Sequence, residues 1–180
     1  MPVQYTAMNI ANFFIQLVQS ISDDTIDNLK LNKILYYTQG WSLVRLGRPL
    51  FTDEIHAWEY GPVVPAVYHQ FKVCKNQPIG EVEDTFDESI LSSKELDLLI
   101  DVYRKYGKYT GVALKNMTHM PGTPWEVIYE RGKNNVITLE SMDRYFRKEA
   151  LSAFEIDSLG IPVITAVPPA WDSNEDAIYD

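Results

Sequence analysis

The sequence is poor in the residues that form disulfides and hold metal ions. It has one cysteine, Cys74, and three histidines, His56, His69 and His119, among 180 residues. A single cysteine cannot close a disulfide within the chain, and the histidines lack the paired spacing that a zinc site requires. We therefore expect no disulfide framework and no structural metal, and no residue pattern indicates a cofactor.

Long hydrophobic runs and an excess of positive charge are also missing. The apolar stretches are interrupted well before 18 residues, and no basic region followed by an apolar run and a cleavage site opens the chain. These absences favour a cytoplasmic protein that does not engage a membrane. The net charge of −9 argues against direct nucleic-acid binding, because nucleic-acid phosphates require clustered Lys and Arg.

Signatures of catalysis are absent as well. The sequence has no nucleophile elbow, P-loop, dinucleotide fingerprint or His-Glu-x-x-His motif. Acid–base chemistry could use His56, which lies near Asp53 and Glu54, or His119. Solvated surface charges explain the first group better, and a hydrogen bond within a turn explains His119 better. We assign no catalytic residue and keep an enzyme of unrecognised type as a second alternative.

Apolar residues make up 46% of the chain, which is enough to bury the core of one domain. Residues 6–20 show one apolar stripe at helical spacing, whereas the apolar side chains of residues 27–46 point in nearly every direction. The second segment is therefore expected to be a central buried helix, ending at Gly47 ahead of Pro49. Later helices are predicted from residue 63 or 64, and over residues 92–106, 110–118, 123–132 and 139–152.

A short extended segment interrupts these helices. Residues 54–60 carry aromatics in partial alternation and end at Gly61-Pro62, which predicts an edge or hairpin strand. A second short strand is expected around residues 79–82, paired with the first. The predicted fold is mainly α (α+β): a compact helical domain around a central buried helix, with a short β-hairpin or small antiparallel sheet.

The end of the chain differs from the rest in composition. Residues 154–180 lack helical periodicity, have β-branched residues around 161–167, and carry four acids in the last nine positions. We expect a domain of residues 1–153 and a C-terminal extension of residues 154–180 that is partly extended and acidic. This extension could add a strand, wrap the domain or contact a partner, and partly ordered terminal chain explains it equally well.

The central helix and its exit form the most basic part of the chain, with Lys30, Lys33, Arg45 and Arg48. A DNA-reading helix would present such charges on one exposed face. Here they are interleaved with leucine, tyrosine and tryptophan. Side chains that reach out to the surface, or that pair with surface acids, explain them better than nucleic-acid contacts do. A DNA-associated phage regulatory protein is kept as the first alternative function.

Aromatic residues and arginines supply a different signal. Tryptophan, tyrosine and arginine are enriched at the hot spots of protein interfaces, although core packing explains most of these rings. We expect Arg48 to strengthen a complex with little effect on thermal stability, and Trp58 to affect both. The residues assigned to partner binding are Trp41, Arg45, Arg48, Trp58, Tyr60, Val63, His119 and Trp125.

Residues 29–72 carry a longer pattern, LKLNKILYYTQGWSLVRLGRPLFTDEIHAWEYGPVVPAVYHQFK. Thr118-His119 followed by Pro124-Trp125, and then GKNNVITLESMDRYF, continue it. Over about residues 8–150 the sequence resembles the Panacea antitoxin domain of SocA-like and GepA-like phage-associated proteins. It departs from that pattern at Asn32, where glutamine is frequent, and after His119, where an acid is frequent.

The resemblance implies a mostly helical, non-enzymatic antitoxin that binds a toxin encoded beside it and holds it inactive. The implied partner is therefore a cognate toxin. A related member delivers its toxin to a bacterial protease, so the resemblance adds a host protease or chaperone as a further partner and a proteolytic adaptor as a further role.

Overall fold

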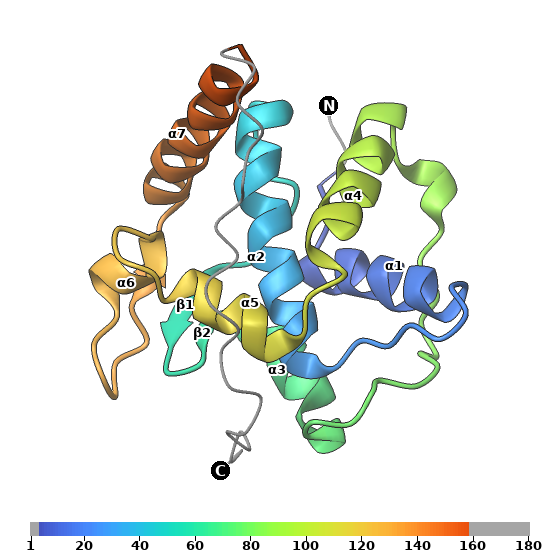
Figure 1. Cartoon of the computed structure of the whole chain (residues 1–180). Helices are drawn as coiled ribbons and strands as arrows, with labels where there is room; N and C mark the ends of the chain where they lie inside the picture. Colours follow the sequence, from blue (N-terminus) through green and yellow to red (C-terminus); the bar gives the residue numbers. More distant parts are fainter. Residues whose placement is uncertain (1–3, 159–180) are drawn as a thin grey trace.

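The computed structural model describes residues 4–158, with side chains as far as residue 152, and most of this range is helical (Figure 1). The expected mainly α (α+β) fold is confirmed. The helices are α1 (Ala7–Gln19), α2 (Asn28–Arg45), α3 (Pro65–Phe71), α4 (Ser93–Tyr106), α5 (Gly111–Thr118), α6 (Pro124–Ile128) and α7 (Leu139–Ser158). Short 3-10 turns cover Lys72–Cys74 and Glu88–Ile90, and the strands are β1 (Ile55–Trp58), β2 (Gly61–Val63) and β3 (Val136–Ile137). No described helix has both the length and the apolar character needed to cross a membrane.

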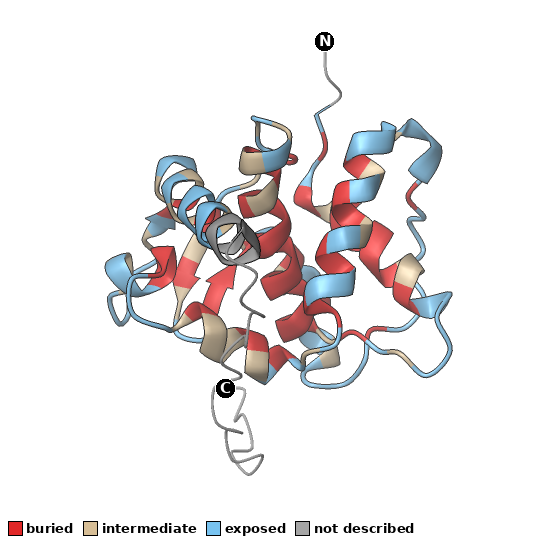
Figure 2. Cartoon of the chain, turned by 45° about the horizontal axis from the view of Figure 1, so that its top comes forward, coloured by how far each residue is buried: buried red, intermediate tan, exposed pale blue. Residues whose placement is uncertain are grey.

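Helix α2 lies at the centre of the fold, as its apolar pattern predicted. It contacts α1, α3, α4, α5, α7 and strand β2, and its residues are buried along most of its length (Figure 2). Its first turn is capped by Asp27, whose carboxylate accepts the backbone N–H of Lys30 at 2.7 Å. Gly40 allows the close approach of α7, because a Cβ atom at this position would overlap the ring of Phe146.

A three-stranded antiparallel sheet in the order β2-β1-β3 lies beside α2. His56 of β1 stands opposite Val63 on one side and Val136 on the other. The prediction of a partner strand at residues 79–82 is wrong, because the chain returns at once through Gly61 and pairs β2 with β1. Pro62 is tolerated there because β2 is an edge strand, where a missing N–H breaks no ladder.

Two helices end at positions that differ from the prediction. Helix α6 stops at Ile128 and not at Gly132, because the side-chain amide of Asn135 donates to the Ile128 carbonyl at 2.8 Å and replaces the next helical bond. Helix α7 continues to Ser158, past the predicted end near residue 152. Residues 161–167, predicted to be extended, lie outside the described residues.

Candidate partner-binding site

The residues predicted to bind a partner fall into two groups along α2. Because an α-helix rises 1.5 Å per residue, Trp41 lies about 12 Å along the axis from Lys33, which contacts the hairpin. Trp41 and Arg45 lie in the last turns of α2 and Arg48 just after it, and all three contact α4. The other group lies where the β1–β2 hairpin meets α5 and α6, and its members are Trp58, Tyr60, Val63, His119 and Trp125.

A pocket of about 290 Å³ opens beside the turn of the hairpin, and we call it the hairpin pocket. Its floor is formed by deeply buried residues of α2, such as Lys33, which is 2% exposed, whereas Tyr60 at the turn is 37% exposed. The pocket therefore deepens from the hairpin turn toward α2. Its lining residues are Asn28, Leu29, Asn32, Lys33, Trp58, Glu59, Tyr60, Gly61, Val63 and Tyr68.

Lys33 is a buried cation whose ammonium group binds backbone. Its Nζ donates to the carbonyl of Pro62 at 3.0 Å, which ties α2 to strand β2. Burial lowers the pKa of Lys33 to about 7; the carboxylate of Asp27 acts against this shift and the charge of Lys115 adds to it. The sequence had suggested that this side chain reaches the surface. It does not, because α2 is covered on all sides around Lys33.

The burial of these lysines removes the main support for a DNA-reading helix. Lys30 is buried like Lys33, and its Nζ donates to the carbonyl of Gly107 at 2.6 Å. The two arginines at the other end of the helix are engaged with carboxylates, Arg45 with Asp101 and Arg48 with Glu95. Helix α2 thus offers no exposed basic face of the kind that major-groove binding requires.

Gly61 makes room for Lys33 in the hairpin. Its φ of +102° lies in the region that favours glycine, and a Cβ atom would meet Cε of Lys33 at 2.5 Å and Oγ1 of Thr118 at 2.9 Å. Glycine is therefore required both by the backbone conformation and by the space. Gly61, predicted to end the first strand, opens β2 in the structure and lines the pocket.

His119 and Trp125 form a stack that supports the hairpin from α5 and α6. Their ring centroids are 3.6 Å apart with an interplanar angle of 3°, and Trp125 Nε1 donates to the carbonyl of Trp58 at 2.7 Å. Burial, together with the charges of Lys115 and Lys33, lowers the pKa of His119 to about 4. The backbone N–H of His119 bonds within the turn after α5, but its ring serves as a neutral packing surface.

The residues of the hairpin group differ from one another in exposure, and therefore in how each could contact a partner. Val63 and Trp125 are buried and position their neighbours, while Tyr60 is exposed and Trp58 and His119 are half-buried. The Trp58 indole packs edge-on against Tyr68, with ring centroids 5.1 Å apart. Its Nε1 is buried and has no hydrogen-bond partner among the described residues. Buried indole nitrogens usually have a partner, so this donor requires an explanation.

The group at the end of α2 is engaged within the fold. Trp41 Nε1 donates to the hydroxyl of Tyr106 at 2.9 Å, its ring lies edge-on to Phe146, and Lys105 Nζ lies 4.8 Å from the ring centroid. Arg45 forms a 2.8 Å ion pair with Asp101 on the surface. These contacts join α2 to α4 and α7.

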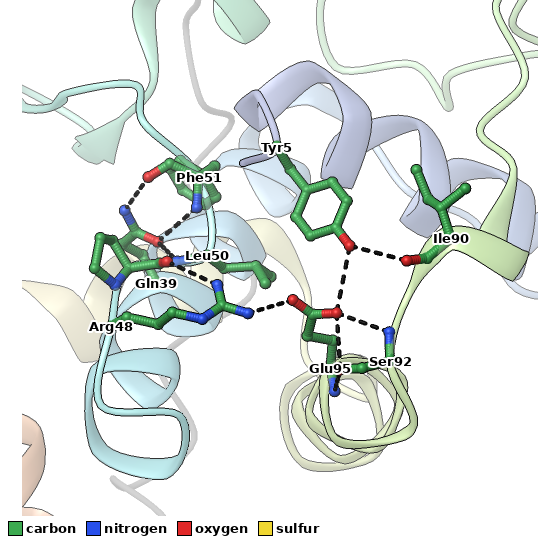
Figure 3. Close-up of polar contacts among 9 residues, drawn as sticks. Tyr5, Gln39, Arg48, Leu50, Phe51, Ile90, Ser92 and Glu95 are labelled. Atoms are coloured by element: carbon green, nitrogen blue, oxygen red, sulfur yellow. Dashed lines mark hydrogen bonds and ion pairs between the residues drawn. The ribbon is translucent and has the colours of Figure 1, made fainter. Parts of the chain in front are cut away.

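Arg48 pairs with a buried carboxylate, that of Glu95 (Figure 3). Burial opposes ionisation of Glu95, but hydrogen bonds from the backbone N–H and hydroxyl of Ser92, together with Arg48, outweigh it and lower the pKa of Glu95. The hydroxyl of Tyr5 also donates to Glu95, at 3.3 Å. Arg48 therefore has a structural contact that the sequence did not suggest, and we now expect it to stabilise the fold.

Seven of the ten residues that line the hairpin pocket were not predicted to bind a partner, and Lys33 and Asn32 are two of them. Lys33 was weighed as a surface charge or a nucleic-acid contact, although leucine, isoleucine and tyrosine side chains lie around it on α2. Asn32 joins α2 to the start of α3, because its Oδ1 accepts the Val64 N–H at 2.9 Å. The signal that could have found both is a polar residue inside a helix with no polar face.

Comparison with known proteins places the chain among antitoxins. The family model described as "Antitoxin SocA-like, Panacea domain" matches residues 31–126, which is more than half of the chain. Antitoxin SocA of Caulobacter vibrioides (strain NA1000 / CB15N) is 31% identical over 188 aligned residues, covering 98% of this chain and 95% of the relative. No solved structure matches the chain. The range matched by the family model contains most of the hairpin pocket and the whole His119–Trp125 stack.

Proposed function

This chain belongs to the family of SocA-like antitoxins with a Panacea domain, and we propose that it neutralises a toxin encoded beside it by binding that toxin directly. The observation that carries the proposal is the family membership. The hairpin pocket supports it, since it combines an exposed aromatic residue with a buried, unused hydrogen-bond donor. Aromatic residues are enriched among those that anchor protein interfaces.

The candidate acid–base residues support binding in preference to catalysis. The carboxylate of Asp53 accepts the backbone N–H of Ala7 at 2.6 Å and so satisfies a donor in the first turn of α1. His56 lies 3.2 Å from the exposed carboxylate of Glu54. Neither residue lines the hairpin pocket. The two groups that could have formed an enzyme site, around His56 and at His119, therefore have structural or surface surroundings.

We place the main toxin contact at the hairpin and not at the end of α2. Arg45 and Arg48 already have carboxylate partners, and the Trp41 indole N–H is already bonded. Around the hairpin, exposed apolar side chains extend over elements that contact one another, β2 with α5 and α5 with α6. These exposed side chains are Tyr60, Val112, Met120 and Val127. A stable interface buries about 800 Å² on each partner, so the toxin must cover these flanks as well as the pocket.

Co-expression with the neighbouring toxin, followed by co-purification and titration calorimetry, tests the proposal. We expect a stable complex whose dissociation constant rises about tenfold or more in Tyr60→Ala, as for a central aromatic anchor. The matched control is Tyr109→Ala, because Tyr109 also lies beside a lysine, Lys108, at 5.2 Å, but on the segment after α4. It should leave the affinity unchanged. Absence of any complex would overturn direct neutralisation, and equal loss in both variants would move the contact away from the hairpin.

Direct neutralisation and delivery to a host protease predict different toxin lifetimes. Neutralisation by binding leaves the half-life of the toxin unchanged or longer when the chain is present. A proteolytic adaptor shortens it, and the shortening disappears in cells that lack the protease. A pulse-chase measurement of toxin level in both backgrounds therefore separates the two mechanisms.

A further inference from the structure

Two residues that line the hairpin pocket carry buried hydrogen-bond donors that the fold does not use. Lys33 has three N–H groups and one bond, to Pro62, while the buried Nε1 of Trp58 has no partner among the described residues. The amides that line the same pocket are satisfied. Asn32 accepts from Val64 and donates to Asn28, which itself donates to the Tyr68 carbonyl. The unused capacity of the buried lining is therefore donor capacity.

Two lysines lie close to the pocket, Lys33 in its lining and Lys115 on α5. Lys115, on α5, is near enough for its charge to bear on Lys33, and its Nζ lies 5.8 Å from the Tyr60 ring centroid at the mouth. Lys115 forms no ion pair with any residue that the structure describes. Glu59, in the hairpin turn, is the carboxylate that lines the mouth, and it is exposed. Lys33 forms no ion pair with the described residues; a buried ammonium without one is costly, and an incoming anion would relieve that cost.

We infer that the hairpin pocket binds a carboxylate group of the toxin, either an Asp or Glu side chain or the C-terminal carboxylate. The inference rests on the proposed function, because the toxin supplies the group. A carboxylate carries only acceptors at neutral pH, which matches the donors of Lys33 and Trp58. The aromatic walls formed by Trp58 and Tyr68 would cover the aliphatic part of the inserted residue, and a volume of about 290 Å³ admits one side chain.

Binding of a carboxylate also couples the complex to pH. The charged groups around Lys33 are Asp27 at the start of α2, Lys115 on α5 and Glu59 in the hairpin, and His119 is neutral above pH 5. A carboxylate raises the pKa of Lys33 above its free value of about 7, so binding takes up a proton. The affinity is therefore fully present below about pH 7 and falls as the pH rises through the higher pKa of the complex, by at most about tenfold per unit.

The decisive variant is Trp58→Phe, measured in the full chain against the toxin. It removes the unused N–H and keeps a ring against Tyr68, so we expect the dissociation constant to rise about tenfold with an unchanged melting temperature. Trp41→Phe is the matched control. It makes the same chemical change where the N–H is bonded to Tyr106, so it should lower the melting temperature and leave the affinity unchanged.

Two further measurements identify the charge and its source. Lys33→Met should abolish the loss of affinity between pH 7 and pH 9 that the wild-type complex shows. In the toxin, one Asp→Asn or Glu→Gln change should raise the dissociation constant, as Trp58→Phe does, if a side chain is bound. A two-glycine extension of the toxin should raise it if the C-terminus is bound. No effect from any of these toxin changes would overturn the inference.

The outcomes separate this inference from the proposed function. If the wild-type chain forms no complex with the toxin, direct neutralisation itself fails. If the complex forms but Trp58→Phe binds as tightly as wild type, or Lys33→Met keeps the same pH profile, the chain is still a direct-binding antitoxin and the carboxylate pocket is refuted.

Discussion

Replacing Arg48 with methionine removes the guanidinium from a buried carboxylate while keeping an unbranched side chain. Glu95 is 4% exposed and would keep its hydrogen bonds from Ser92 and Tyr5. Removing one member of a fully buried pair costs about 3–5 kcal/mol, and a hydrogen bond to a charged group contributes about 1.5–3 kcal/mol. The Arg48 side chain is 31% exposed, so solvent screens the pair, and we expect a loss of about 2 kcal/mol.

Calorimetric and urea unfolding of the purified chain measure this loss. A change of about 2 kcal/mol corresponds to about 4–8 °C in melting temperature for a domain of this size. Arg45→Met is the matched control, because its ion pair with Asp101 is exposed on both sides. An exposed pair contributes about 0–1 kcal/mol, so this variant should melt close to wild type.

The pH dependence gives the same prediction a second test. Because the pKa of Glu95 is lowered in the folded state, its contribution is fully present above the unfolded pKa of about 4.3 and is lost as the pH falls through the folded value. The difference between wild type and Arg48→Met should therefore narrow below about pH 4. Equal stability of Arg48→Met and Arg45→Met at pH 7, or a difference that persists to pH 2, would refute the role given to the pair.

Two other predictions concern the hairpin. Gly61→Ala should cost about 2–4 kcal/mol in urea unfolding, because alanine is strained at the positive φ and its methyl group displaces Lys33; a loss below about 1 kcal/mol would contradict that packing. In an NMR titration the ring of His119 should have a midpoint near pH 4, so stability is full above the unfolded pKa of about 6.5 and declines as the pH falls toward 4. A midpoint near 6.5 would show that the stack on Trp125 does not bury the imidazole.

Local patterns predicted the helices well because their signals lie within each helix. The apolar residues of 27–46 surround the helix axis, and that pattern alone indicates a helix packed on several sides. Ser92 and Glu95 form the expected capping box, and the Thr123 side chain accepts the backbone N–H of Glu126 as expected at a helix start. In each case the bonding partner stands three residues away, within reach of sequence inspection.

The parts that were missed depend on partners distant in the sequence. Strand β2 forms because Gly61 adopts a positive φ and because Pro62 can sit on an edge. Residues 79–82 join no strand, and the Ile79 N–H donates to the Ile26 carbonyl at 2.8 Å instead. Helix α6 ends where the side chain of Asn135 reaches it, seven residues beyond its last residue. The burial of Lys33 depends on a carbonyl that stands 29 residues further along the chain.

Residues of the sequence pattern that resembles the family also make the contacts that build the hairpin pocket. Lys33 reaches the hairpin because Gly61 has no side chain, and Trp125, stacked on His119, holds the carbonyl of Trp58. Packing accounts for these contacts, but Nε1 of Trp58 and Nε2 of His119 are left without a hydrogen-bond partner among the described residues. The Trp58 N–H is unbonded and Lys33 forms no ion pair with the described residues, although phenylalanine and methionine would fill similar space at lower cost. The retained donors therefore favour a function at this pocket beyond folding, and a bound acceptor from outside the chain meets that requirement.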